Sequence, residues 1–113
     1  MLARVEDISH ASGISMPAYG HAGDGNLHVN FLWNDSAERP RVDEALLDLL
    51  RATLAMGGTL SGEHGIGVMK APFLSLEQDE ALISLQKNMK SVFDPHGLLN
   101  PGKIFAASGH RAC

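Results

Sequence analysis

One stretch of this 113-residue chain predicts a β-hairpin that carries two histidines: Tyr19-Gly20-His21-Ala22-Gly23-Asp24-Gly25-Asn26-Leu27-His28-Val29-Asn30. Glycine adopts positive φ without steric cost and aspartate favours turns, so we expect the chain to reverse at Gly23-Asp24-Gly25. That reversal brings the imidazoles of His21 and His28 together at the base of the hairpin. We expect Asp24 to hold the turn through its own backbone rather than to bind a ligand.

The residues on either side of the turn have the pattern of two short strands. After the turn, apolar residues alternate with polar ones from 26 to 33, which is typical of a strand with one buried face. His28 and Asn30 share the opposite face. Before the turn, residues 14–19 also predict a strand, with an irregularity at Pro17, because proline cannot donate to a ladder. The apolar face consists of Leu27, Val29, Phe31 and Trp33.

Three helices are expected around this hairpin. The first covers residues 2–10, and the second begins at Pro40 and ends at Gly57-Gly58. The third follows a capping-box pattern, Ser75-x-x-Gln78, and ends at Asp94-Pro95. A short extended piece at 59–61 and a brief helical turn at 68–74 complete the prediction. The expected buried side of the third helix consists of Leu82, Leu85, Met89, Val92 and Phe93.

These elements predict an α+β fold in which helices pack on one face of a small antiparallel sheet. The chain has no strand–helix alternation long enough for a doubly wound parallel sheet. Two glycine-rich stretches, at 23–28 and 62–67, both fail the Gly-x-Gly-x-x-Gly spacing. A nicotinamide dinucleotide fingerprint is therefore unsupported.

Two converging histidines are the beginning of a metal site, which in enzymes has three protein ligands and an open position. Glu63, in the glycine-rich segment Ser61-Gly62-Glu63-His64-Gly65-Ile66-Gly67, offers the third ligand. Each of these residues alone is more often structural, but together they match a catalytic zinc-type ligand set, and other divalent metals have similar preferences. His64 is suited to act as a general base beside a cation.

Composition limits the class of protein. A hydrophobic content of 44% with 19% charged residues is typical of a globular domain, and a net charge of −4 without a basic run argues against a nucleic-acid partner. The one cysteine, Cys113, is the last residue, so we expect no internal disulfide and a reducing compartment. Without a long apolar run or a secretory signal, the chain is expected to be cytoplasmic, with peripheral docking at the inner membrane left open.

Three motifs, at 20–30, 57–67 and 94–103, resemble the C-terminal region of FAD-linked 2-hydroxyacid dehydrogenases and oxidases of the vanillyl-alcohol-oxidase type. This group includes the glycolate oxidase D subunit, D-lactate dehydrogenase and D-2-hydroxyglutarate dehydrogenase. The resemblance implies oxidation of a D-2-hydroxy acid such as glycolate or D-lactate to the 2-oxo acid. It also implies a role for each residue that matches the motifs: metal ligation by His21, His28 and Glu63, proton abstraction by His64, substrate contact by Asn30, and approach to the flavin by Asn100.

The resemblance also implies what this chain needs from elsewhere. In the family, the FAD-binding domain lies N-terminal to these motifs, and we expect it to be absent from these 113 residues. Residues 1–105 are then the substrate- and metal-binding part, and 106–113 are a flexible tail. The expected partners are a small 2-hydroxy acid, an FAD-binding domain or subunit, and a second copy of the chain over an exposed apolar face.

Two alternatives remain open from the residues alone. A small metal-dependent hydrolase could use the same two histidines and glutamate to activate water. A non-catalytic assembly module could retain the pocket without using it.

Overall fold

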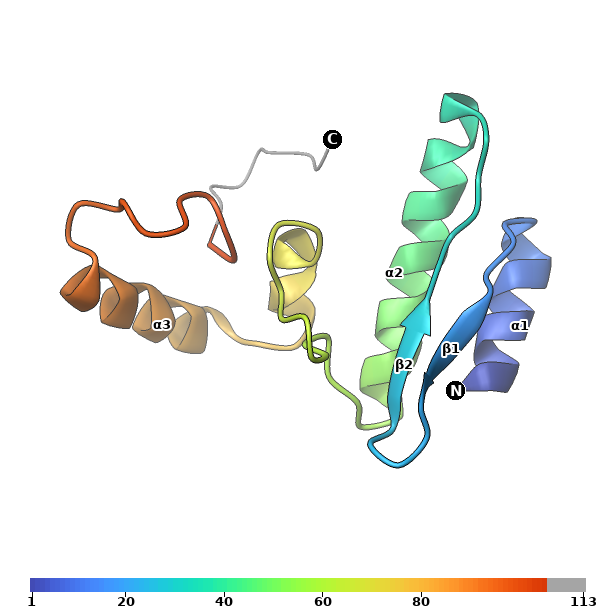
Figure 1. Ribbon diagram of the computed structural model, residues 1–113, viewed down its shortest axis with the longest axis horizontal. Coiled ribbons are helices and arrows are strands. Elements are labelled where there is room, and N and C mark those ends of the chain that lie inside the picture. The colour runs from blue at the N-terminus through green and yellow to red at the C-terminus, as the bar shows by residue number, and fades with distance from the viewer. Residues whose placement is uncertain (106–113) are drawn as a thin grey trace. The chain divides into compact units, whose positions relative to one another are not determined.

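A computed structural model describes residues 1–105 of the chain, so the predicted tail at 106–113, with Cys113, lies outside the described residues. The chain divides into two compact units, Met1–Thr59 and Leu60–Cys113. The first contains α1 (Leu2–Ser12), β1 (Ala18–His21), β2 (Asn26–Val29), the short helix η1 (Ser36–Glu38) and α2 (Arg39–Ala55), and the second contains η2 (Ala71–Leu76) and α3 (Glu80–Phe93) (Figure 1). Within residues 1–105, no helix has the length and apolar character needed to cross a membrane.

In the first unit, α1 and α2 cover one face of the β1–β2 hairpin, as Figure 1 shows. The two strands pair antiparallel, with Ala18 opposite Val29 and His21 opposite Asn26. Because neighbouring strand residues point to opposite faces, one face of the hairpin packs on the helices and the other carries the histidines. The α+β prediction is confirmed. The core consists of Val5, Ile8, Ile14, Met16, Val42, Ala45 and Leu49, with Ala18, Leu27, Val29 and Phe31 packed against it.

The strands are shorter than predicted, and Pro17 explains the interruption. The backbone N–H of Asn30 donates to the carbonyl of Pro17 at 3.0 Å, but proline has no N–H to return a bond. Pairing resumes as a single bridge between Ser15 and Leu32. Trp33, beyond this bridge, is 39% exposed instead of lying in the core, and Arg39 stands 6.0 Å from its ring centre.

The first two helices agree with the prediction. Helix α1 ends at Gly13, whose φ of 68° gives the left-handed cap that favours glycine. Helix α2 has Pro40 in its first turn and buries four apolar residues at the three-to-four spacing of one helix face. The buried residues of α2 are Val42, Ala45, Leu49 and Leu50.

The second unit departs from the prediction at the cap of α3 and in the segment at 59–61. The residue that caps α3 is Asp79, whose carboxylate accepts from the N–H of Leu82 at 2.8 Å, and Ser75 lies inside η2 instead. A capping residue needs an extended backbone, which Asp79 has and a residue within a helical turn lacks. The predicted extended piece at 59–61 forms no strand, whereas the helical turn predicted at 68–74 appears as η2.

The apolar side of α3 was predicted to be buried and is exposed. No residue of α3 is buried, and exposure rises from 42% at Leu82 to 80% at Phe93. Periodicity identifies which residues share a face of a helix, but not whether another element packs against that face.

Candidate metal centre

The turn of the hairpin places His21 and His28 side by side. Their rings meet edge to face, with centroids 5.9 Å apart and planes at 80°. The N–H of Asp24 donates to the carbonyl of His21 at 3.1 Å, and Gly25 has a φ of 66°, so the turn forms as predicted. Between the two histidine positions, Gly20 faces Leu27 so closely that a β-carbon would lie 2.1 Å from the carbonyl oxygen of Asn26.

The separation of the two rings is close to that of two ligands on one cation. With zinc–nitrogen bonds of about 2.0–2.1 Å, the ring centres of two imidazoles on one tetrahedral zinc stand roughly 5.2 Å apart. The centroids of His21 and His28 are 5.9 Å apart, which corresponds to a wider ligand angle than the tetrahedral one. His21 is exposed and His28 half-buried, so an ion can reach both from solvent.

Tyr19 belongs to the same face of the hairpin and was not singled out from the sequence. It lies directly opposite His28 in the ladder, and the two rings stack with centroids 5.2 Å apart and planes 18° from parallel. The signal was available, because Tyr19 and His21 are two residues apart in one strand and must share a face.

Glu63 and His64 lie in the second unit, on an irregular backbone. The Nε2 atom of His64 stands 3.2 Å from Oε1 of Glu63, although neighbouring residues on a regular strand point apart. The irregularity comes from a turn closed by the N–H of Gly65, which donates to the carbonyl of Gly62 at 3.0 Å. The turn therefore allows the adjacent side chains of Glu63 and His64 to face each other.

Two charged side chains bind the backbone just before this glycine-rich turn. The ammonium of Lys70 donates to the carbonyl of Leu60 at 2.8 Å, and the carboxylate of Glu77 accepts from the N–H of Leu60 at 2.9 Å. Leu60 itself is buried. The N–H and the carbonyl of Leu60, three positions before Glu63, are therefore both bound by side chains. The sequence pattern did not single out either side chain.

The remaining predicted site residues are the two asparagines. Asn30 is exposed just beyond β2, where its backbone continues the ladder to Pro17. Asn100 is exposed in the second unit, with a left-handed φ of 51°. The segment that follows Asn100 returns to the glycine-rich turn, since the N–H of Ile104 donates to the carbonyl of Gly67 at 2.8 Å.

Asp94 binds the backbone of the segment that leads to Asn100. It is buried, and it accepts from the ammonium of Lys90 and from the N–H groups of Leu98 and Leu99 at 2.8 and 3.0 Å. The Lys90 hydrogen bond lowers the pKa of the Asp94 carboxyl, and the two backbone donors add to this against the opposing effect of burial. Lys90 also donates to the carbonyl of Leu99 at 3.1 Å, so one ion pair holds the two residues before Asn100.

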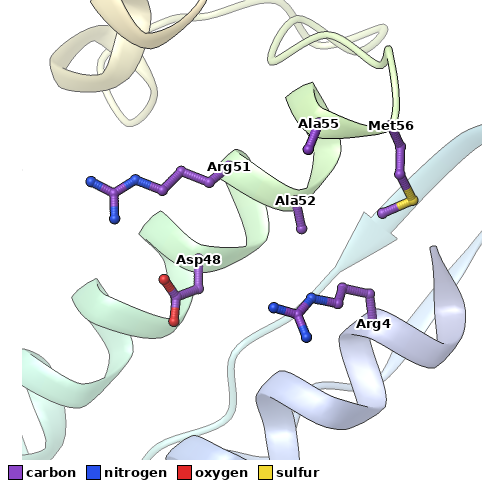
Figure 2. Close-up of a pocket in the computed structure, with 6 residues that line it drawn as sticks. All are labelled: Arg4, Asp48, Arg51, Ala52, Ala55 and Met56. Atoms are coloured by element: carbon purple, nitrogen blue, oxygen red, sulfur yellow. The ribbon is translucent and has the colours of Figure 1, made fainter.

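A surface hollow of about 500 Å³ in the first unit contains none of the predicted site residues. Figure 2 shows it along α2, with Arg4 reaching in from α1. The guanidinium of Arg4 stands 3.6 Å from the carboxylate of Asp7 on the same helix, and this ion pair partly neutralises the charge of Arg4. The lining lacks a cluster of metal ligands: it consists of Arg4, Asp48, Arg51, Ala52, Ala55 and Met56.

Comparison with known proteins gives the family of this chain. The family described as FAD linked oxidases, C-terminal domain, matches residues 1–104, almost the whole chain. This chain belongs to that family. The resemblance found in the three motifs is thereby confirmed, and the chain is part of a family of FAD-linked dehydrogenases and oxidases.

Curated relatives of this FAD-linked oxidase domain support the same assignment. It is 39% identical over 113 residues to glycolate oxidase subunit GlcD of Bacillus subtilis, covering 98% of this chain and 24% of the relative. It is 38% identical over 96 residues to D-2-hydroxyglutarate dehydrogenase of Stutzerimonas stutzeri, covering 79% and 20%. A probable mitochondrial D-lactate dehydrogenase of Danio rerio is 42% identical over 96 residues, covering 83% and 19%. The chain thus spans a quarter or less of the length of these relatives.

Proposed function

We propose that this chain is the substrate- and metal-binding part of an FAD-dependent oxidoreductase that converts a D-2-hydroxy acid to the 2-oxo acid. The observation that carries the proposal is the histidine pair on the exposed face of the hairpin, in a chain that belongs to the FAD-linked oxidases. Three of its relatives are named for glycolate, D-lactate and D-2-hydroxyglutarate, which are all small 2-hydroxy acids. Membership of the FAD-linked oxidases favours an oxidoreductase over a hydrolase or an assembly module.

In this proposal His21, His28 and Glu63 hold a divalent cation, with zinc the first candidate. The cation, when bound, supplies Lewis-acid polarisation of the substrate's hydroxyl and carboxylate. The contribution of the chain is to present the two imidazoles at a separation that one ion can bridge, 5.9 Å between ring centres. The carboxylate of Glu63 adds negative charge that matches a divalent ion.

His64 is proposed to accept the hydroxyl proton of the substrate. Its Nε2 lies 3.2 Å from Glu63, so a hydrogen on Nε2 is favoured and Nδ1 becomes the accepting nitrogen. As the hydroxyl proton moves to Nδ1, the electron pair of the broken O–H bond forms the C=O bond, and the hydrogen at C2 leaves with its bonding pair as hydride. FAD, when bound, supplies the acceptor of that hydride.

The two asparagines are proposed to position the reactants. Asn30 extends from the end of β2 toward the substrate, and Asn100 approaches the flavin from a segment held by Asp94. The flavin is bound mainly by an FAD-binding domain or subunit outside this chain. A cytoplasmic location and a homodimer remain predictions, the latter motivated by the exposed apolar side of α3.

Metal binding by the chain tests the ligand assignment. Cobalt(II) titration followed by visible absorption, with zinc competition, should show one site per chain. We expect His28→Ala to weaken binding at least about 100-fold, because loss of a ligand removes a coordinate bond. His10→Ala, a change of an exposed histidine on α1, serves as the matched control and should leave binding unchanged. Equal affinity of the two variants would refute the assignment.

A chimaera tests the reaction. This chain replaces the corresponding quarter of B. subtilis GlcD, and anaerobic bleaching of the flavin is recorded with glycolate, D-lactate or D-2-hydroxyglutarate. Bleaching by at least one acid, lost in His64→Ala with the flavin still bound, is the expected result. A folded, flavin-loaded chimaera that none of the three acids reduces would contradict the proposed function.

A further inference from the structure

Three aromatic rings contact one another on the exposed face of the hairpin. The ring of Tyr19 lies flat on the imidazole of His28, at 5.2 Å and 18°, and His21 meets His28 edge to face at 5.9 Å and 80°. Tyr19 is 61% exposed, so its ring covers His28 rather than filling the core. The contact follows from the ladder, in which Tyr19 is paired directly with His28.

A ring stacked on the face of an imidazole can orient it without blocking ligation. The nitrogen lone pairs of an imidazole point outward in the plane of the ring, so the face of His28 is not where a cation binds. Ligating histidines depend on neighbouring groups that fix the direction of the ring, usually through a hydrogen bond from the second nitrogen. Here the near-parallel ring of Tyr19 restrains the plane of His28, and the edge contact of His21 sets the angle between the two ligands.

We infer that Tyr19 is a positioning residue for the metal site: its ring pre-orients the imidazole of His28 for joint ligation with His21. This rests on the proposed metal-binding function. The role belongs to the aromatic face, since stacking uses the ring and not the hydroxyl. Phenylalanine at this position should therefore replace tyrosine, whereas leucine, which is apolar but has no flat face, should not.

The test is the same cobalt(II) and zinc(II) titration, applied to Tyr19→Leu and Tyr19→Phe. Tyr19→Leu should weaken metal affinity between about three- and tenfold, in the range that the free energy of an aromatic pair gives. Tyr19→Phe should bind within twofold of the parent. Trp33→Leu is the matched control, because it also replaces a partly exposed aromatic of the same hairpin region, and the ring contact of Trp33 within residues 1–105 is with Arg39.

A second measurement needs no metal. In the ion-free protein, the ring protons of His28 should move downfield in the NMR spectrum of Tyr19→Leu, because the shielding face of the tyrosine is removed, and stay close to the parent in Tyr19→Phe. Unchanged His28 signals in Tyr19→Leu, or an affinity loss below twofold while His28→Ala abolishes binding, would overturn the role of Tyr19 alone. Absence of His28-dependent binding in the parent would instead overturn the metal function on which the role rests.

Discussion

Gly20 is the position where one added methyl group should disrupt both the hairpin and the proposed site. A β-carbon there would lie 2.1 Å from the carbonyl oxygen of Asn26, and ordinary contact begins at 3.4 Å, so the strands would have to separate by about 1.3 Å. The obstacle is backbone, which cannot rotate away as a side-chain end can. Because Tyr19–His28 and His21–Asn26 are the pairs on either side of Gly20–Leu27, the displacement falls within the proposed site.

The expected cost follows from the size of this clash. Forcing a group into occupied space destabilises the folded state by about 1–3 kcal/mol. Alanine also lowers the conformational entropy of the unfolded chain, which offsets about 0.4–1 kcal/mol of this cost. Gly20→Ala should therefore lower the free energy of unfolding of the first unit by up to about 2.6 kcal/mol. Gly23→Ala is the matched control: its β-carbon would meet no atom within 4 Å, and its φ is not positive, so it should be neutral or slightly stabilising.

Urea unfolding followed by tryptophan fluorescence measures this difference, because the single tryptophan, Trp33, lies in the first unit. Cobalt(II) affinity should fall in Gly20→Ala and not in Gly23→Ala. Unfolding free energies within about 0.5 kcal/mol of each other for the two variants would refute the close approach of the strands at Gly20.

Two further predictions concern the ion pair after α3 and the core of the first unit. The pKa of Asp94 is lowered in the folded chain, chiefly by Lys90, so its contribution to stability should be complete above the ordinary carboxyl pKa of about 3.9 and disappear as pH falls through the lowered value. NMR titration of the Asp94 carboxyl carbon should show this shift in the parent and a smaller one in Lys90→Met, where the N–H donors of Leu98 and Leu99 remain, and an unshifted parent pKa would contradict it. Leu49→Ala should cost about 2–5 kcal/mol in urea unfolding, because Leu49 is 7% exposed, whereas Leu32→Ala, at 57%, should change stability by less than about 1 kcal/mol. Equal losses for the two leucines would exclude Leu49 from the core.

Much of the fold was predictable because its causes are local. A period of two in 26–33 and a Gly-Asp-Gly turn were sufficient to predict the hairpin, and periods of three to four were sufficient for α1 and α2. Capping was less predictable, since Ser75 and Asp79 both suit a helix start, and the choice depends on where η2 ends. Burial of the apolar side of α3 was also not predictable. The spacing of apolar residues along the helix does not show whether another element packs against them.

For the proposed site, the sequence by itself determined the candidate residue types: two histidines across a tight turn, and a glutamate and histidine among glycines. Only the tertiary structure placed Tyr19 on His28, drew Lys70 and Glu77 onto the backbone of Leu60, and buried Asp94 beneath the segment that carries Asn100. Turn chemistry and side-chain alternation depend on neighbours in the chain, and so they can be read in order. A stacked ring or a charged clamp depends on the directions that side chains take and on the distances between them in space, and these exist only after the chain has folded.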